Sequence, residues 1–152
     1  MNRLYFDTNF FLYLSDKSSP FRQRCTKFIK YCKEEKILIS TSAETIQEII
    51  HYTKNIKQSE QGLKAAKKTL NLLDEFIAID KSIINTYLKC ASVYKNAGSR
   101  DLIHLAVCIE NKIDKIVTFD QDFAKFKEIK IFDLLWSCLT VKVLLFSLKK
   151  MN

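Results

Sequence analysis

The sequence predicts an α/β layer fold with a mostly parallel central sheet. Short apolar runs that suit buried strands alternate with amphipathic stretches that suit helices. Tight turns must be few, because the 152 residues include only 2 Gly and 1 Pro, and this argues against an all-β fold. The length suits one compact domain, so we expect a single domain over residues 1–152.

The first half of the chain is expected to hold two buried strands and four helices. The strands are the short apolar runs at 3–6 and 37–40. The pattern predicts helices over 10–14, 21–35, about 42–53 and 54–76. The last of these helices should present an apolar face made of Leu63, Ala66, Leu70 and Leu73.

The second half repeats the alternation and ends in an unusual apolar run. Strands are expected at 76–79, 115–119 and 129–132. Helices are expected over 82–96 and 100–111, the second with Ser99 as its N-cap. The segment 134–148 is strongly apolar but short for a membrane span, and it contains Lys142. We expect it to be an atypical C-terminal core or dimer-interface element.

The charge balance predicts a polyanionic partner. Lys and Arg number 25 against 17 acidic residues, which gives a net charge of +8 and favours nucleic acid over a membrane. Residues 21–36, 54–70 and 81–100 each carry a net charge of +4. Within the second stretch, Lys64, Lys67 and Lys68 either contact RNA phosphates or form a solvated helix face. The scarcity of glycine excludes a glycine-rich phosphate loop.

Cysteine usage predicts a reducing compartment. The 5 Cys are widely spaced without a C-x-x-C pair, and there are 2 His, so neither a zinc site nor a disulfide framework is expected. Asp7 interrupts the first apolar stretch, and no small-residue cleavage site follows, so no signal peptide is expected. We therefore predict a cytoplasmic protein without a membrane partner.

Four acidic residues occupy positions that predict a metal site. Asp7 and Asp120 each terminate a predicted strand, Asp101 lies in the first turn of an apolar helix, and Glu48 lies in the helix after the second strand. The carboxyl ends of parallel strands share one edge of a sheet, where ligands bind. Four carboxylates gathered there would repel one another unless a cation neutralised them. Without a Cys or His cluster, Mg²⁺ or Mn²⁺ is the natural ion, and it suits phosphodiester cleavage.

Two of these acids have competitors nearby. Glu44 competes with Glu48, but it stands three residues after Thr41 at a capping-box position, so its carboxylate is expected to bond the local backbone. Asp122 competes with Asp120, and we favour Asp120 because it stands at the strand end.

Four other residues are candidates for supporting roles. Asn9 and Thr118 are expected to orient the carboxylates from behind. His104 lies one turn after Asp101 and is either a hydrogen-bonded core histidine or a general acid. Arg100 either contacts phosphate or is a solvated residue of the first helical turn.

Several strings of residues resemble the motifs of PIN-domain nucleases. Phe6-Asp7-Thr8-Asn9 is similar to the opening motif, and Glu48 matches the second acid. The string from Ser99 to Ala106 resembles the third acidic motif, and the string from Val117 to Phe123 resembles the fourth. The motifs span about residues 3–133 in the family's order. Size and basic charge suggest the VapC-like toxin branch.

The resemblance carries its own implications. It implies a PIN-like three-layer fold, a Mg²⁺-dependent endoribonuclease that acts as the toxin of a toxin–antitoxin pair, a homodimer, and a small antitoxin partner. The alternatives are an RNA-processing nuclease of the same fold without an antitoxin, or a non-catalytic RNA- or protein-binding PIN domain. A phosphotransferase with an aspartyl nucleophile is disfavoured, because Asn9 stands where its second Asp is usually found.

Overall fold

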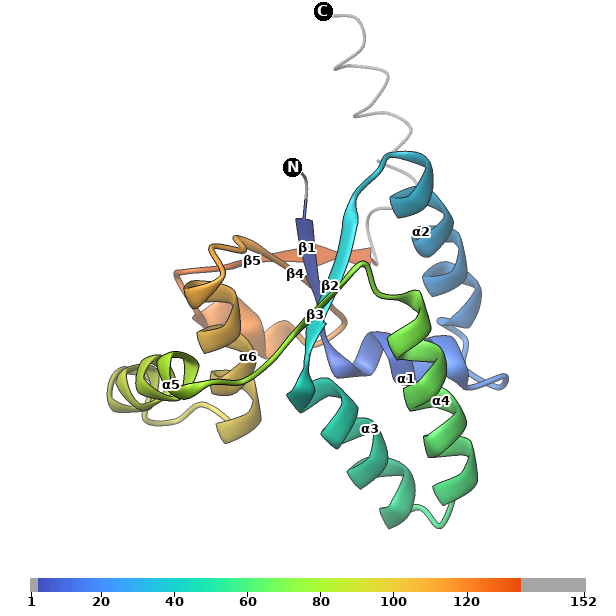
Figure 1. Ribbon diagram of the computed structural model, residues 1–152, viewed down its shortest axis with the longest axis horizontal. Helices are drawn as coiled ribbons and strands as arrows, with labels where there is room; N and C mark the ends of the chain where they lie inside the picture. Colours follow the sequence, from blue (N-terminus) through green and yellow to red (C-terminus); the bar gives the residue numbers. More distant parts are fainter. Residues whose placement is uncertain (1–2, 135–152) are drawn as a thin grey trace, which may run out of the picture.

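A five-stranded parallel sheet forms the centre of the computed structural model, which describes residues 3–134 (Figure 1). The strand order is β3-β2-β1-β4-β5, and every neighbouring pair is parallel. The strands are β1 (Arg3–Phe6), β2 (Leu38–Ser42), β3 (Glu75–Ile77), β4 (Lys115–Thr118) and β5 (Lys130–Asp133). The predicted α/β fold with a parallel sheet is thus confirmed, and β1 lies at its centre.

Helices cover both faces of the sheet, which makes three layers. One side holds α1 (Thr8–Ser15), α2 (Arg22–Glu34), α3 (Ala43–Asn55) and α4 (Ser59–Leu72). The other side holds α5 (Lys81–Val93), α6 (Ser99–Glu110) and the short 3₁₀ helix η1 (Gln121–Lys125). Figure 1 shows the pair α5 and α6 apart from the pair α3 and α4, with the sheet between them.

Alternation along the strands divides the buried residues into two cores. Phe6 and Val117 belong to the core under α1–α4, whereas Tyr5 and Ile116 belong to the core under α5 and α6. Successive side chains of a strand point to opposite faces, so adjacent residues enter different cores. Tyr5 and Asp7, two residues apart, therefore leave β1 on the same side.

The helix predicted over 54–76 is shorter at both ends, since α4 spans Ser59–Leu72, and of its predicted apolar face Ala66 is buried but Leu63 and Leu70 are not. Residues 54 and 55 belong to α3 and residues 56–58 connect it to α4, whose buried side consists of Gly62, Ala65, Ala66 and Thr69. Leu63 is 56% exposed and Leu70 is 44% exposed. The reason is a close approach of α3, because a Cβ at Gly62 would lie 1.9 Å from Thr53 Oγ1. Small residues, not leucines, fit this contact.

The start of α6 also differs from the prediction. Gly98 is the N-cap and Ser99 is the first helical residue, with no side-chain hydrogen bond closing the helix. The Ser99 hydroxyl instead bonds the Tyr87 hydroxyl at 2.9 Å, which joins the start of α6 to α5. A contact to another helix has taken the place of the predicted cap.

The end of the described chain lies at Leu134, which is fully buried. The rest of the apolar segment 134–148 lies outside the described residues. Within 3–134, no helix combines the length and apolar character that a bilayer span needs. Cys25, Cys32, Cys90 and Cys108 are all buried free thiols.

Three lysines end helices in the left-handed backbone region. Lys36, Lys57 and Lys112 have φ angles of 54°, 59° and 54°. Each follows a helix, and the backbone N–H of the residue after the lysine donates a hydrogen bond to a carbonyl of the last helical turn. After Lys112, for example, Ile113 N–H donates to Cys108 O at 2.9 Å. Glycine usually occupies this position because a Cβ is strained there. The chain carries this strain at exposed lysines.

Replacing Lys112 by glycine should therefore stabilise the protein. We expect Lys112→Gly to raise the free energy of unfolding by about 1 kcal/mol, because glycine adopts a positive φ without steric cost. Urea unfolding measures the difference. Lys112→Ala is the matched control, since it removes the charge but keeps the Cβ. Equal effects of the two substitutions would assign any change to charge and contradict this account.

Candidate active site

Asp7 begins the site at the carboxyl end of the central strand. It is the N-cap of α1, and its side chain is almost fully buried. Carboxylate Oδ1 accepts a hydrogen bond from Thr8 N–H at 2.7 Å, and Oδ2 accepts one from the Thr118 hydroxyl at 2.7 Å. Donors on α1 and β4 thus fix both oxygens.

Glu48 reaches the same place from α3. Its Oε2 accepts hydrogen bonds from the Thr8 hydroxyl and from His104 Nε2, the latter at 2.8 Å. Its Oε1 lies 3.6 Å from Arg100 Nε. Asp7, Glu48 and His104 offer possible ligand atoms that all lie within 4.8 Å of one another. The carboxyl edge of the sheet therefore carries a compact group of two acids and one imidazole.

His104 is buried on α6 and uses both ring nitrogens. Nε2 bonds Glu48 and lies 3.6 Å from Asp7 Oδ1, while Nδ1 bonds the Tyr5 hydroxyl at 2.6 Å. The Tyr5 hydroxyl also bonds the Ser42 hydroxyl at 2.7 Å. Sequence reasoning missed Tyr5 and Ser42. The available signal was a tyrosine inside a buried strand, whose hydroxyl must find a partner.

Asp101 and Asp120 lie outside that compact group. Asp101 is half-buried in the first turn of α6, and its Oδ2 lies 3.6 Å from Lys125 Nζ. Asp120 caps η1 by accepting a hydrogen bond from Asp122 N–H at 2.8 Å. The charge of Asp120 helps to raise the pKa of Asp101. Of the four acids proposed from the sequence, Asp7 and Glu48 thus form an inner pair, whereas Asp101 and Asp120 lie outside it, and the side chain of Asp122 is exposed.

Asn9 and Thr118 connect Asp7 to β4. Asn9 Nδ2 donates to Thr118 Oγ1 at 3.0 Å, and Asn9 Oδ1 accepts from Phe119 N–H at 3.3 Å. The Thr118 hydroxyl can then give its own proton to Asp7. Asp120 N–H also donates to Thr118 Oγ1, at 3.0 Å. One threonine hydroxyl therefore links Asp7, Asn9 and Asp120.

Burial and mutual charge shift the pKa values of this group. Burial raises the pKa of Asp7, although His104 and the hydrogen bonds oppose it. Burial also acts to raise the pKa of Glu48, but the hydrogen bond and charge of His104, together with the Thr8 hydrogen bond and the Arg100 charge, outweigh it and leave that pKa lowered. Burial acts to lower the pKa of His104, and the carboxylates of Glu48 and Asp7 reverse this effect. Burial, reinforced by Asp120, raises the pKa of Asp101 against the pull of Lys125. A cation at this edge would relieve the repulsion.

The capping box expected at Glu44 is absent. Ser42 is the N-cap of α3 and makes no side-chain hydrogen bond to the helix. The Thr41 hydroxyl instead donates to Phe6 O at 2.7 Å and is used to hold β2 against β1. Glu44 is partly buried, and its charge helps to raise the pKa of His104. Glu48, in contrast, bonds His104 directly.

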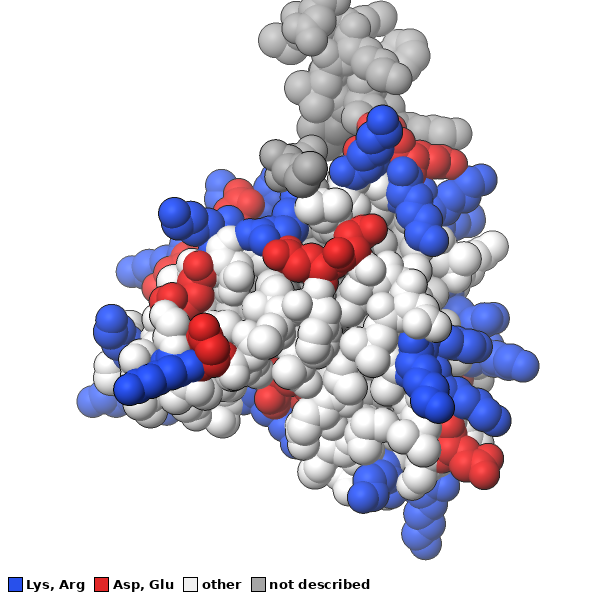
Figure 2. Space-filling model, in the orientation of Figure 1, with Lys and Arg blue, Asp and Glu red and all other residues white. Residues whose placement is uncertain are grey.

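Basic side chains occur in two settings, on exposed helix surfaces and beside the acids of the site. Lys64, Lys67 and Lys68 are all exposed on α4. Figure 2 shows basic side chains gathered over α4 and over the end of α2, beside a broad uncharged face. Arg100 and Lys125 are the two basic residues paired with the acids of the site. Sequence reasoning missed Lys125, which lies in the same 3₁₀ turn as Asp122.

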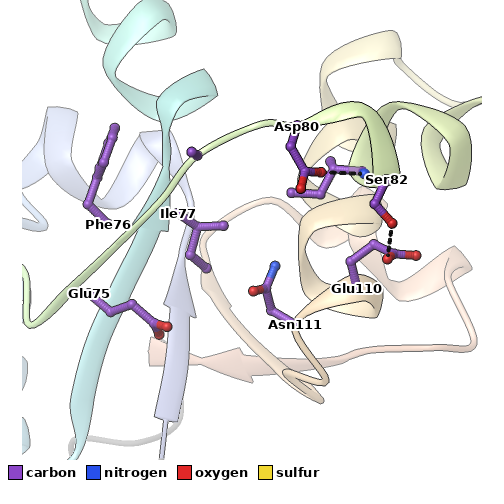
Figure 3. Close-up of a pocket in the computed structure, with 9 residues that line it drawn as sticks. Glu75, Phe76, Ile77, Asp80, Ser82, Glu110 and Asn111 are labelled. Carbon is purple, nitrogen blue, oxygen red and sulfur yellow. Dashed lines mark hydrogen bonds between the residues drawn. The ribbon is translucent and has the colours of Figure 1, made fainter.

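A pocket away from this site also contains acidic residues. The pocket, of about 450 Å³, is bordered by β3, the start of α5 and the end of α6 (Figure 3). Its carboxylates already have partners within the protein: Glu75 with Arg3 at 2.8 Å, Asp80 with Ile83 N–H at 3.0 Å, and Glu110 with Ser82 at 2.7 Å. These groups stabilise the fold, and the candidate site is the one around Asp7.

Fold and site together define a three-layer α/β protein with an acidic cluster at the carboxyl edge of its parallel sheet. The chain belongs to the PIN domain family, whose sequence pattern matches residues 4–129. The resemblance stated from the motifs is thus confirmed, including the VapC-like branch, to which the following relatives belong by name.

Two relatives come from Mycobacterium tuberculosis. Ribonuclease VapC23 is 26% identical over 121 residues, which is 80% of this chain and 95% of that protein. Ribonuclease VapC13 is 26% identical over 124 residues, which is 82% of this chain and 95% of that protein.

Solved structures share the fold. VapBC2 from Rickettsia felis, bound to a DNA fragment from its promoter, matches with a TM-score of 0.71 and 16% identity over 85% of this chain and 96% of that chain. VapC20 from Mycobacterium tuberculosis, described as a sarcin-ricin loop cleaving toxin, matches with a TM-score of 0.66 and 17% identity. That match covers 83% of this chain and 98% of VapC20.

Proposed function

We propose that this chain is a metal-dependent endoribonuclease and the toxin of a toxin–antitoxin pair. The observation that carries the proposal is the group of Asp7, Glu48 and His104, whose ligand atoms lie within 4.8 Å of one another at the end of the central strand. Relatives named as VapC ribonucleases and VapBC structures support the RNA substrate and the antitoxin. The free, buried cysteines fit a cytoplasmic setting.

The donor set of the site fits Mg²⁺ or Mn²⁺. Carboxylate oxygens are the ligands these ions prefer, and Asp7 and Glu48 would hold the ion, with Asp101 and Asp120 completing the acidic edge. Burial raises the pKa of Asp7, so its anionic form gains from a nearby cation. When bound, such an ion lowers the pKa of a water molecule and polarises the scissile phosphodiester.

The protein's own groups would hold the acids ready for the reaction. Thr118 and Thr8 direct hydrogen bonds at Asp7 and Glu48, which fixes the carboxylates before any ligand arrives. His104 is 1% exposed and uses both ring nitrogens, so we assign it to holding Glu48, not to protonating a leaving group. Asn9 has the same kind of supporting role behind Thr118.

Arg100 and Lys125 are suited to bind the RNA backbone at the site. Their side chains are 45% and 35% exposed, and each lies 3.6 Å from an acid, Glu48 and Asp101 respectively. A cation on the acids would weaken these long ion pairs and free both side chains for a phosphate. Guanidinium and ammonium groups are the usual protein partners of phosphate.

Exposed apolar side chains favour protein partners. Among the described residues, they are Tyr52 of α3 and Ile56 at its C-cap, Leu63 and Leu70 of α4, Phe76 of β3, and Ile84, Leu88 and Val93 of α5. Exposed apolar patches commonly mark interaction sites. These side chains lie on both helical layers and on the edge strand β3, and we assign them to contacts with the antitoxin and with a second copy in a homodimer.

Removing a single carboxylate charge should abolish cleavage. Asp7→Asn and Glu48→Gln should each lower Mg²⁺-dependent cleavage of RNA by more than about 100-fold, beyond the losses typical of residues behind metal ligands. The fold should survive Asp7→Asn, because Asn caps helices as well as Asp does. Gel assays of RNA cleavage and circular dichroism measure the two effects.

Asp114→Asn is the matched control. It makes the same chemical change at an exposed residue outside the site. Near-wild-type cleavage by Asp7→Asn at low Mg²⁺ would refute the assignment. If Glu44→Gln inactivates the protein and Glu48→Gln does not, the roles of the two glutamates are exchanged.

Growth of cells producing each variant separates the alternatives. If the protein is a toxin, production of the wild type should arrest growth, and production of Asp7→Asn should not. RNA cleavage without growth arrest favours an RNA-processing nuclease, and RNA binding without cleavage favours a non-catalytic PIN domain.

The lysines of α4 should contribute affinity for RNA without sequence choice. Replacing Lys64, Lys67 and Lys68 by Gln should weaken binding and flatten its salt dependence, by a slope of about 0.7 for each phosphate contact on single strands. A salt series with the Asp7→Asn background measures this without cleavage. Identical slopes would place this face outside the RNA path, and a moved cleavage site would show that these residues read bases.

A further inference from the structure

A chain of buried hydrogen bonds reaches the site from beneath. The Ser42 hydroxyl bonds the Tyr5 hydroxyl at 2.7 Å, the Tyr5 hydroxyl bonds His104 Nδ1 at 2.6 Å, and His104 Nε2 bonds Glu48 Oε2 at 2.8 Å. Ser42 and Tyr5 are 0% exposed and His104 is 1% exposed. This series of hydrogen bonds therefore runs through the interior and ends on Glu48, an acid of the site.

Four separate elements supply the links. Ser42 ends β2, Tyr5 lies in β1, His104 lies in α6 and Glu48 lies in α3. Because Tyr5 lies in β1 and Asp7, two residues on, continues it in extended conformation, they face the same side of the sheet. The Tyr5 hydroxyl is thereby placed directly behind the imidazole that contacts both inner acids.

Packing does not require a hydroxyl at Tyr5. Its neighbours in the core include Leu105, Ile116 and Phe123, and a phenylalanine would fill the same space without burying a polar atom. The hydroxyl is needed by His104, because an imidazole that bonds a carboxylate through one nitrogen is oriented by the partner of the other. Without Tyr5, Nδ1 would be buried with no partner among the contacts seen here.

We propose that Tyr5 is a positioning residue, whose hydroxyl, held by Ser42, fixes the His104 ring so that Nε2 holds Glu48 ready for the cation. Every link is satisfied in either protonation state of His104, because Nε2–H donates to Glu48 in both. The Tyr5 hydroxyl donates to Nδ1 of the neutral ring while it accepts from Ser42, and it accepts from Nδ1–H of the protonated ring while it donates to Ser42. A ring turned from this position loses the bond to Glu48 and its approach to Asp7 at 3.6 Å. This role rests on the proposed function of the site as a metal centre.

Tyr5→Phe tests the proposal through two readouts that do not depend on activity. The first is the affinity for Mn²⁺, measured by electron paramagnetic resonance of the free ion, which should fall about tenfold, as is usual for a residue behind a metal ligand. The second is the ¹⁵N-attached Nε2–H proton of His104, which should be protected from exchange in the wild type and lost in the variant. The chain has 2 His, and exposed His51 is an internal reference.

Tyr94→Phe is the matched control. It removes a hydroxyl that bonds Glu128 at 2.8 Å, on the surface and outside the site. The control should keep both the Mn²⁺ affinity and the His104 signal. A merely structural role of Tyr5 would lower the melting temperature without changing either readout.

Ser42→Ala is a second variant in case Tyr5→Phe does not fold. Ser42 makes no side-chain bond to α3, so its removal costs no helix cap. We expect a smaller loss of Mn²⁺ affinity, because Tyr5 keeps its bond to His104 but loses its own support. Wild-type affinity and an unchanged His104 signal in the folded variants would overturn the role of Tyr5. A wild-type protein that binds no Mn²⁺ would instead refute the metal centre itself.

Discussion

The confinement of Asp7 and Glu48 near one another is the constraint on which the site depends. Two carboxylates and an imidazole share a space only 4.8 Å across, largely out of contact with water. Such an arrangement is unfavourable unless hydrogen-bond donors and positive charge compensate it. Thr8, Thr118 and His104 supply the donors, and each comes from a different element.

The fold makes this arrangement possible. Because all five strands are parallel, their carboxyl ends meet at one edge, and β1 at the centre brings Asp7 between the ends of β2 and β4. Helices α3 and α6 begin at that edge from opposite sides of the sheet, so Glu48 and His104 approach Asp7 from both layers. A hydrogen-bond network that spans three layers resists movement of any one member, which suits the proposed binding of a cation without rearrangement.

Much of this could be predicted from the sequence, because strand ends and helix starts are local features. Asp7, Asp101 and Asp120 stand at positions that a short apolar run or a helical pattern defines without any tertiary information. The errors have a common physical origin in contacts between distant elements. The close approach of α3 at Gly62 requires small residues on the buried face of α4. The Ser99 hydroxyl bonds Tyr87, and the Thr41 hydroxyl bonds the Phe6 carbonyl, so neither caps its helix as predicted. The Tyr5 chain and the pairing of Lys125 with Asp101 likewise join residues far apart in sequence.

The location of a bound cation tests the central claim most directly. Crystals grown with Mn²⁺ and measured near its absorption edge would give an anomalous difference map with the ion as its strongest feature. Our account predicts a peak coordinated by the carboxylates of Asp7 and Glu48 at the end of β1, and no such peak in Asp7→Asn. A peak only at the pocket of Glu75, Asp80 and Glu110, or no peak at the end of β1, would contradict it.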